Sequence, residues 1–351
     1  MALDALDRQW SPDPAGTLRS VLVVTDAWHP QVNGVVRTIE QLAAELHRLG
    51  IETQLLTPSG LRTVPLPGYP EIGLALTAAA PIVQRVEALR PDAIHIATEG
   101  PLGLIVRNYC VRKRIPFTSA YHTQFPEYLR ARMPVPLKFG YGAVRWFHGP
   151  SRAVLVGTPH VERLLRDRGF DNVALWTKGV DTGLFAPSRR RVLDYAGPIF
   201  LYVGRVAVEK NIEAFLKLDL PGTKLVVGSG PSLSSLQLRY PQAVFLGARH
   251  GEELAAFFAS ADVFVFPSRT DTFGLVLLEA LASGTPVAAY PVTGPIDVVR
   301  SGQIGALDED LRRAVLSAMS ASREACRTYA MDYSWQNSSA QFLAAQVRIA
   351  W

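Results

Sequence analysis

The chain has 351 residues, of which 48% are hydrophobic and 19% are charged, a composition typical of globular proteins and unlike that of disordered or fibrous ones. At roughly 150 residues per domain, this length predicts two domains. The formal net charge is +5, and the two distant cysteines, Cys110 and Cys326, exclude a disulfide framework and a cysteine-based metal knuckle, so a reducing compartment is expected.

The N-terminal residues carry Asp4, Asp7 and Asp13 before any apolar run, which is the wrong order for a secretory signal. No stretch of the sequence approaches the roughly 18 uninterrupted apolar residues of a membrane span. We therefore expect a cytoplasmic protein that is soluble or peripheral on the inner face of the plasma membrane.

Apolar runs alternate with amphipathic stretches along the first half of the chain. Strands are predicted over residues 20–25, 53–57, 93–98, 117–121 and 154–157. Between the first two, residues 35–49 place apolar side chains at three- and four-residue spacing, which predicts a helix. This alternation predicts a parallel sheet flanked by helices.

Two residues at the ends of these strands are candidates for a ligand site. Gly34 closes the loop after the first strand, where the missing side chain lets a ligand approach the backbone or serves turn geometry alone. His122 directly follows strand 117–121, so it faces the carboxyl edge of the sheet as a site residue or packs there as an ordinary histidine.

Residues 105–168 hold twelve basic and three acidic residues, so this segment has a net charge of +9 and the rest of the chain −4. Such a cluster indicates a phosphate-bearing polymer or an anionic membrane as partner, or else a solvated basic face. Within residues 128–148, aromatic side chains including Trp146 are interleaved with Arg130, Arg132, Lys138 and Arg145. That mixture suits the headgroup boundary of an anionic membrane, although an ordinary packed helix with solvated arginines gives the same pattern.

The pattern is interrupted over residues 181–198 by Pro187, the arginine run 189–191, Gly197 and Pro198, without an element of its own. We therefore expect an N-terminal domain over 1–180, a linker over 181–198 and a C-terminal domain over 199–335. Residues 336–351 are expected to form a helix that packs back toward the N-terminal domain. The predicted fold class is α/β, with two tandem Rossmann-like domains facing across a cleft.

The second half predicts strands over residues 199–203, 225–227, 244–246, 263–266 and 286–289. Arg205 and Lys210 follow the first of them. At a strand end both cations face the cleft, where they neutralise a diphosphate or remain surface charges.

Residues 266–279 predict a strand end followed by a helix that begins near Phe273. The amides of Phe273, Gly274 and Leu275 then form a helix N-terminus suited to phosphate. Asp271 and Glu279 are eight residues apart and suit hydroxyl groups of a sugar and a ribose, with a plain N-cap as the alternative for Asp271.

These pieces, in this order, resemble the large retaining nucleotide-sugar glycosyltransferases of the glycosyltransferase-B architecture. The family includes bacterial lipid mannosyl-, glucosyl- and sulfoquinovosyltransferases. The resemblance covers residues 19–342, and residues 268–299, SRTDTFGLVLLEALASGTPVAAYPVTGPIDVV, are similar to the family signature.

The resemblance implies that Arg205 and Lys210 bind the donor diphosphate and that Glu279 holds the ribose hydroxyls. Asp271 matches the first glutamate of the family's E-x7-E element and contacts the transferred sugar together with the amides of residues 273–275.

By the same resemblance, His122 lies beside the donor sugar and Gly34 belongs to the glycine-rich loop under it. Many members have Glu where Asp271 stands, and two glycines where Asn33 and Gly34 stand. These departures bear on the identity of the donor.

The implied reaction is glycosyl transfer with retention and without a metal or cofactor, because cations and amides stabilise the departing diphosphate. No D-x-D follows an apolar strand, and the acids at 308–310 suit a helix start. Without a convincing enzyme nucleophile, we expect attack on the donor's own face, with a phosphate oxygen taking the acceptor proton. A UDP-sugar is the favoured donor, and GDP-mannose is a second candidate.

The basic and aromatic segment favours a membrane lipid as acceptor, such as diacylglycerol, a ceramide or a glycolipid. A soluble or polyprenyl-linked saccharide in polysaccharide assembly is the alternative. Nucleic-acid binding is a remote hypothesis, because no reading helix or stacking sheet is recognisable. A nicotinamide-dependent oxidoreductase would need G-x-G-x-x-G in the first loop, which is lacking. We expect a monomer or weak oligomer.

Overall fold

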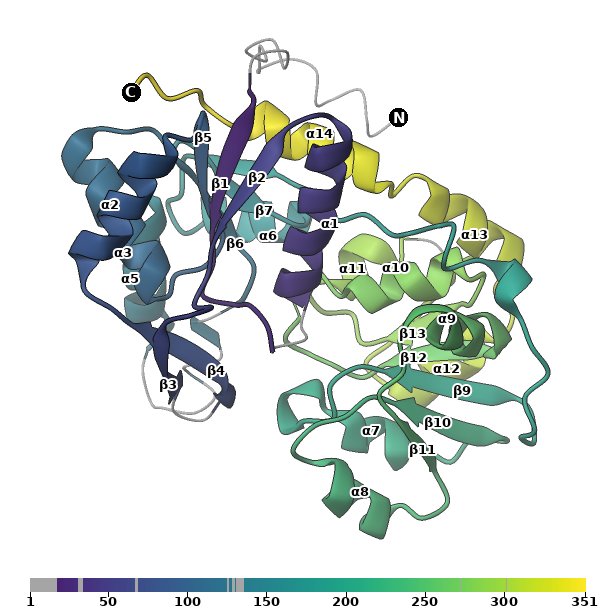
Figure 1. Ribbon diagram of the computed structural model, residues 1–351. Coiled ribbons are helices and arrows are strands. Elements are labelled where there is room, and N and C mark those ends of the chain that lie inside the picture. Colours follow the sequence, from purple (N-terminus) through teal and green to yellow (C-terminus); the bar gives the residue numbers. More distant parts are fainter. Residues whose placement is uncertain are drawn as a thin grey trace.

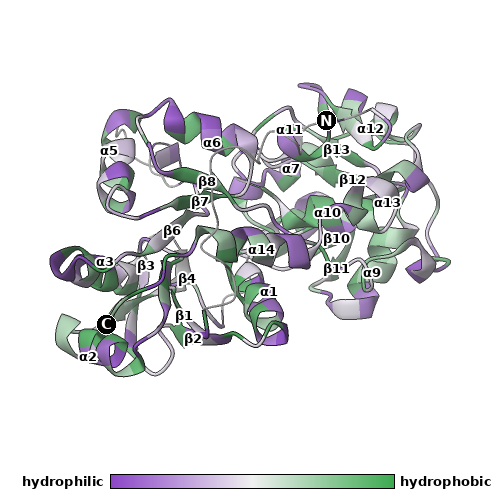
Figure 2. Cartoon of the chain, turned by 90° about the horizontal axis from the view of Figure 1, so that it is seen from above, coloured by the Kyte–Doolittle hydropathy of each residue, from purple (hydrophilic) through white to green (hydrophobic). Residues whose placement is uncertain are grey.

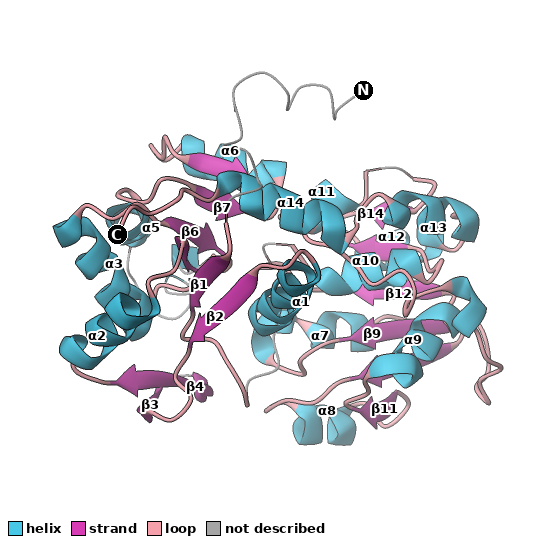
Figure 3. Cartoon of the chain, turned by 45° about the horizontal axis from the view of Figure 1, so that its top comes forward, coloured by secondary structure: helices cyan, strands magenta, loops and turns pink. Residues whose placement is uncertain are grey.

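The structure is a computed structural model that describes residues 18–30, 34–66, 69–124, 126–127, 130, 136–271, 273–300 and 302–351. These residues form two six-stranded parallel sheets, each covered by helices on both faces (Figures 1 and 3). The predicted α/β class with two parallel-sheet domains is confirmed. Hydrophobic residues are concentrated along the strands (Figure 2), as expected for sheets buried on both faces.

The first sheet has the strand order β2-β1-β5-β6-β7-β8. Its strands are β1 (Ser20–Val24), β2 (Glu52–Leu56), β5 (Ala93–Ile96), β6 (Thr118–Tyr121), β7 (Val154–Val156) and β8 (Val173–Leu175). Its helices are α1 (Gly34–Arg48), α2 (Ala79–Leu89), α3 (Pro101–Lys113), α5 (Leu137–His148) and α6 (Pro159–Arg166). All five strands predicted for this half are present, with ends shifted by one or two residues.

Two features of the first half were not predicted. An antiparallel hairpin, β3 (Arg62–Leu66) and β4 (Tyr69–Leu76), stands apart from the parallel sheet. Its sequence contains Pro65 and Gly73 and shows no clear alternation of apolar and polar residues. The edge strand β8 has only three residues, too few for a periodic signal.

The second sheet has the order β11-β10-β9-β12-β13-β14. Its strands are β9 (Ile199–Val203), β10 (Thr223–Val227), β11 (Val244–Gly247), β12 (Val263–Phe266), β13 (Val287–Ala289) and β14 (Gly305–Leu307). Its helices are α7 (Ile212–Leu216), α8 (Leu233–Arg239), α9 (Gly251–Ser260), α10 (Leu275–Ala282), α11 (Pro295–Val298), α12 (Leu311–Ala318) and α13 (Arg323–Met331), with a short 3-10 turn η2 (Val208–Lys210). If these six strands are numbered by their order along the chain, their order in the sheet is 3-2-1-4-5-6, which is that of dinucleotide-binding folds. The short strand β14 was not predicted.

Along the chain, strands are added first on one side of each sheet and then on the other. The strand order switches between β1 and β5 in the first sheet, and between β9 and β12 in the second. Open α/β sheets bind ligands outside the carboxyl ends of the strands at such switch points. Arg205 follows β9 and Asp271 follows β12, so two of the predicted site residues stand at the switch point of the second sheet.

The last helix, α14 (Trp335–Ala345), returns to the first sheet and lies beside α1 (Figure 1). The indole Nε1 of Trp176 donates to Ser338 Oγ at 3.1 Å, and Phe342 is fully buried against the same sheet. The segment 181–198 contains one 3-10 turn, η1 (Pro187–Arg189), where the sequence predicted no element. Proline fixes the backbone angle that starts such a turn.

Candidate functional site

The loops after β9 and β12 are joined by polar contacts. The ammonium group of Lys210 forms an ion pair with the carboxylate of Asp271. The next residue, Asn211, donates from Nδ2 to the carbonyl of Pro267 at 3.0 Å. Lys210 and Asp271, which the sequence placed in one site, are therefore in contact.

Arg205 is held at the end of β9 by its neighbours. Its backbone carbonyl accepts a hydrogen bond from the hydroxyl of Tyr202 at 2.8 Å, and its Nη1 lies 3.3 Å from Glu209 Oε1. The guanidinium stands on the same loop as Lys210, so the two cations lie at one strand end, as predicted.

Helix α10 begins at Leu275, two residues later than predicted, because Gly274 occupies the N-cap with a φ of 82°. A side chain there would be strained and would meet Phe266 and Leu277 at 3.2 Å. The N-cap is a glycine without a side chain, so the alternative in which Asp271 caps α10 is wrong, and this carboxylate pairs with Lys210. Phe273, just before the N-cap, is buried.

The predicted ribose ligand Glu279 is the fifth residue of α10, and its side chain is 9% exposed. Its Oε1 accepts a hydrogen bond from Arg37 Nη1 at 3.1 Å. Burial raises the pKa of this carboxyl group, and the charge of Arg37 acts in the opposite sense. A Cβ on Gly34, the first residue of α1, would lie 3.9 Å from Leu275 Cδ1. The structure therefore brings the start of α1 against the start of α10, from opposite halves of the chain.

His122 lies just beyond β6, with its ring centroid 5.6 Å from that of Trp176. Burial lowers the pKa of His122 well below the ordinary value, and the nearby charges of Lys178 and His95 act in the same sense. The imidazole is therefore neutral at neutral pH.

Lys178 is a residue that the sequence analysis missed. Its side chain is 6% exposed, and its Nζ lies 3.5 Å from the centroid of the Trp176 ring. Burial lowers the pKa of Lys178 to about 7. No signal in the sequence pointed to it, because the strand that it follows, β8, was not predicted.

A buried polar network connects α5 to the interior strand β6 of the first sheet. His148, the last residue of α5, lies 3.1 Å through Nε2 from Glu99 Oε1 and 2.8 Å through Nδ1 from Ser119 Oγ. Glu99, His148 and Ser119 are connected in the same order as the acid, the base and the nucleophile of a hydrolase triad. Both Ser119 and His148 are fully buried, so the serine has no access to a substrate and the network holds α5 to the sheet.

The predicted membrane segment is described in part. Arg130 is exposed, while Arg132 lies outside the described residues. Lys138 is exposed, with Nζ 5.2 Å from the Phe139 ring centroid. Arg145 donates from Nη1 to the carbonyl of Arg168 at 3.1 Å, so it takes part in local structure.

Helix α5 buries one face and exposes aromatic residues on the other. The buried residues are Gly140, Tyr141, Val144, Phe147 and His148. Phe139 and Trp146 are 62% and 58% exposed, and they are seven residues apart, which places them on one helix face. Arg107 stacks on Trp146 at 4.1 Å from the ring centroid.

Other features lie away from these residues. No three His, Cys, Asp or Glu side chains come together as a metal site within the described part of the chain. Asp310 caps α12 by accepting hydrogen bonds from two backbone amides, as predicted for the acids at 308–310.

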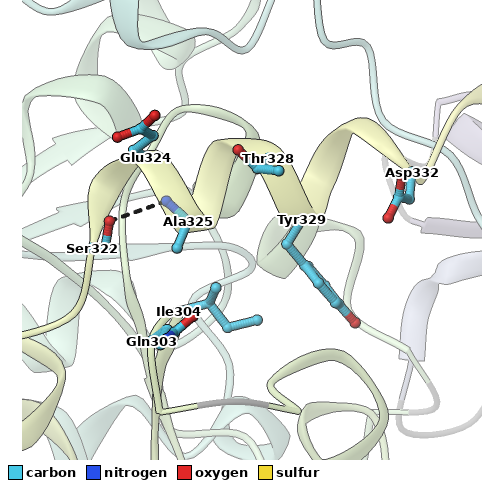
Figure 4. A pocket seen from close by; sticks show the side chains of 8 residues that line it. All are labelled: Gln303, Ile304, Ser322, Glu324, Ala325, Thr328, Tyr329 and Asp332. Atoms are coloured by element: carbon cyan, nitrogen blue, oxygen red, sulfur yellow. Dashed lines mark hydrogen bonds between the residues drawn. The ribbon is translucent and has the colours of Figure 1, made fainter.

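A hollow between α13 and Gln303–Ile304 contains none of the predicted site residues (Figure 4). Of the helices described here, none has both the length and the apolar character to cross a bilayer.

Comparison with known proteins finds two family models that match this chain, one over each half. The family model Glycosyltransferase Family 4 matches residues 32–184, and the model Glycosyl transferases group 1 matches residues 197–321. A GDP-mannose-dependent alpha-mannosyltransferase of Mycobacterium tuberculosis is 33% identical over 315 residues, which cover 82% of this chain and 83% of the relative.

Two further likenesses cover most of the chain. An alpha-monoglucosyldiacylglycerol synthase of Streptococcus pneumoniae is 27% identical over 343 residues, covering 84% of this chain and 77% of the relative. Among solved structures, a sucrose-phosphate synthase from Thermosynechococcus elongatus superposes with a TM-score of 0.72 at 22% identity, covering 92% of this chain and 97% of that one. The structural likeness supports the glycosyltransferase-B fold.

Proposed function

The chain belongs to the glycosyltransferase family whose models match both of its halves, and from this membership we propose that it is a retaining, metal-independent enzyme with a membrane lipid as acceptor. Transfer of a glycosyl group from a nucleotide sugar is the activity of the family. The proposal adds the stereochemical course, the acceptor and the residues. It assigns residues 1–180 to the acceptor and residues 199–335 to the donor, joined by 181–198.

The observation that carries the proposal is the contact of cations and carboxylates at the start of α10. Lys210 pairs with Asp271 shortly before the N-cap Gly274, and Arg205 stands on the same loop as Lys210, so the proposal places a diphosphate between these cations and the amides of Gly274 and Leu275. Glu279, the fifth residue of α10, is held by Arg37 of α1 and suits the ribose. GDP-mannose is the first donor to test, since the mycobacterial relative is named for it, and UDP-sugars follow.

Retention is proposed because both carboxylates of this site are held in ion pairs. Asp271 is paired with Lys210 and Glu279 with Arg37, and a paired carboxylate is a weakened nucleophile. In the proposed step the acceptor oxygen forms a bond to C1 of the sugar on the face from which the diphosphate leaves. The bond from C1 to the phosphate oxygen breaks, and the acceptor proton passes to that phosphate. Arg205 and Lys210 stabilise the charge that develops there.

The lipid acceptor is supported by α5 and by the charge around it. The net +9 segment, residues 105–168, contains the exposed Phe139 and Trp146, a combination that suits an anionic membrane surface. The streptococcal relative is named as a synthase of a glucosyldiacylglycerol. A soluble or polyprenyl-linked saccharide remains the alternative acceptor, and the experiment below separates the two.

The test incubates the protein with labelled GDP-mannose or UDP-glucose, in excess chelator, and vesicles of anionic phospholipid and diacylglycerol. We expect label in the lipid extract. Lys210→Ala should lower the rate about tenfold to a hundredfold, because a hydrogen bond to a charged group contributes roughly 1.5–3 kcal/mol. The matched control is Lys217→Ala. Lys217 is a 65% exposed lysine at the C-terminal end of α7, in the same half of the chain.

Three outcomes would contradict parts of the proposal. Label that enters only added water-soluble saccharides would favour the alternative acceptor. Activity that chelator abolishes and magnesium restores would remove metal independence. Equal rates for Lys210→Ala and Lys217→Ala would remove Lys210 from the site.

A further inference from the structure

An ion pair connects the two halves of the molecule at the proposed donor site. Arg37 belongs to α1, which lies on the side of the first half that faces the second (Figures 1 and 3). Its Nη1 lies 3.1 Å from Oε1 of Glu279 in α10, a residue 242 positions later in the chain. The pair therefore exists only while α1 and α10 are in contact.

Glu279 depends on this partner. Its carboxylate is 9% exposed, and burial of a charged group without a partner is strongly unfavourable. The charge of Arg37 opposes the effect of burial on the pKa of Glu279. Arg37 itself is 35% exposed and keeps access to water. The buried carboxylate therefore depends on the arginine more than the arginine depends on the carboxylate.

The two oxygens of Glu279 differ. Oε1 accepts the hydrogen bond from Arg37, whereas Oε2 is buried and has no hydrogen-bond partner among the described residues. Buried carboxylate oxygens are normally hydrogen-bonded. Since Arg37 fixes one oxygen, the orientation of the other is fixed as well, and it suits a ligand that donates hydrogen bonds.

We propose that Arg37 is a positioning residue of the donor site: it neutralises and orients Glu279 from the opposite half of the molecule, so that Oε2 accepts hydrogen bonds from the 2′- and 3′-hydroxyls of the donor ribose. This inference rests on the proposed function, in which Glu279 binds the ribose. It adds that the ribose is recognised only when a residue of the acceptor half is in place.

The experiment measures discrimination between a ribonucleotide and its dideoxy form. GDP and UDP are titrated calorimetrically against the full chain, each beside its 2′,3′-dideoxy analogue. The variants are Arg37→Ala, Arg37→Lys, Glu279→Gln and, as control, Arg48→Ala. Arg48 is a 61% exposed arginine of the same helix that pairs with Glu45.

We expect the wild type to prefer the ribonucleotide by about tenfold or more, as a hydrogen bond to a charged group allows. Arg37→Ala should lose most of this preference while its affinity for the dideoxy analogue stays near that of the wild type. Arg37→Lys should restore part of it, because lysine keeps the charge without the planar fork. Arg48→Ala should behave as the wild type. A general structural defect would instead weaken both ligands together, and thermal unfolding of each variant checks the fold.

The result that overturns the inference is a full ribose preference in Arg37→Ala together with a lost preference in Glu279→Gln. That pattern would leave the proposed ribose ligand in place without Arg37. A wild type without any preference, or a full preference in Glu279→Gln, would instead contradict the assignment of Glu279 in the proposed function.

Discussion

The carboxylates Asp271 and Glu279 stand near the start of one helix, and each is held by a cation from another element. Lys210 comes from the loop after β9, and Arg37 comes from the opposite half. In the proposed donor site, these ion pairs fix the hydrogen-bond acceptors before the ligand arrives, which lowers the cost of ordering them on binding. Its buried charges should nevertheless reduce the stability of the fold.

Replacement of Glu279 by Gln tests this trade between function and stability. Because burial raises the pKa of Glu279 above its ordinary value, the folded state binds more protons than the unfolded state between the two values. The wild type therefore loses stability as pH rises through that range, and Glu279→Gln avoids the loss. We expect Glu279→Gln to exceed the wild type in unfolding free energy at pH 7.5 and to approach it near pH 4.5, while transfer falls about tenfold or more.

Urea unfolding across that pH range, run beside the transfer assay, is the measurement. Glu253→Gln, on the exposed face of α9, is the control. A Glu279→Gln variant with lower stability than the wild type at pH 7.5 would contradict the account of its burial.

Lys178 supports a second prediction, with the opposite dependence on pH. Its pKa in the folded state is about 7, and the ordinary value is 10.5, so between them the unfolded state binds the extra proton. Stability therefore rises with pH across this window, and the cost of burying the charge is fully present below pH 7. Lys178→Met should be more stable than the wild type by up to about 4–5 kcal/mol at pH 6.5, as 1.36 kcal/mol per pKa unit allows.

The measurement compares the unfolding free energies of Lys178→Met and the wild type at pH 6.5, 8 and 9.5. The difference should shrink steadily as pH rises. The exposed Lys217→Met serves as the control. A difference that does not change with pH would show that Lys178 keeps its proton throughout.

Sequence patterns predicted those candidate site residues that follow a strand recognisable in the sequence. Arg205, Lys210 and Asp271 follow predicted strands, so their place at the carboxyl edge could be inferred from neighbouring residues. Arg37 and Lys178 could not be found in this way. The partner of Arg37 is 242 residues away, and the burial of Lys178 depends on Trp176 and the packing around it.

Among the elements, α5 is the helix on which the proposed membrane contact rests. A double variant, Phe139→Ser with Lys138→Gln, removes an exposed aromatic ring and a charge without touching the buried face. We expect the double variant to co-sediment less with anionic vesicles and its binding to depend less on salt. The loss of the lysine should cost about 1 kcal/mol of membrane-binding free energy, and the loss of the ring should cost more. Titration with GDP should be unchanged.

The control for α5 is Leu238→Ser with Lys217→Gln in the second half, where Leu238 is 84% exposed. Its co-sedimentation should equal that of the wild type. Equal sedimentation of all three proteins would mean that the basic segment is a solvated face.

The elements that escaped prediction are short or lie outside the parallel pattern. Strands β8 and β14 have three residues each and occupy the edges of their sheets, and three residues are too few for a periodic signal. The hairpin β3-β4 is antiparallel and contains a proline. The long central strands were found because burial on both faces requires continuous apolar runs.

At the scale of the whole molecule, α14 connects the end of the chain to the first sheet. Phe342 is fully buried beside Trp176 and His95, with ring centroids 5.2 and 5.0 Å away. Phe342→Ala should cost about 3–5 kcal/mol of unfolding free energy, as deletion of a buried aromatic ring does. Denaturant unfolding followed by tryptophan fluorescence checks this, and a loss below 1 kcal/mol would mean that α14 contributes little to the first half.

Several contacts join the two halves of the molecule. Arg37 contacts Glu279, the amide of His160 donates to the Asp297 carboxylate, and Val180 donates to the carbonyl of Tyr333. In the proposed function, a sugar bound through its diphosphate to the second half meets an acceptor presented by the first.

The most direct test of this account is the anomeric configuration of the product. Labelled GDP-mannose or UDP-glucose is supplied with vesicles of anionic phospholipid and diacylglycerol, the lipid is extracted, and the linkage is determined by NMR. We expect a glycolipid whose sugar keeps the anomeric configuration of the donor. A glycolipid with the inverted configuration, or a sugar that never enters the lipid fraction, would contradict it.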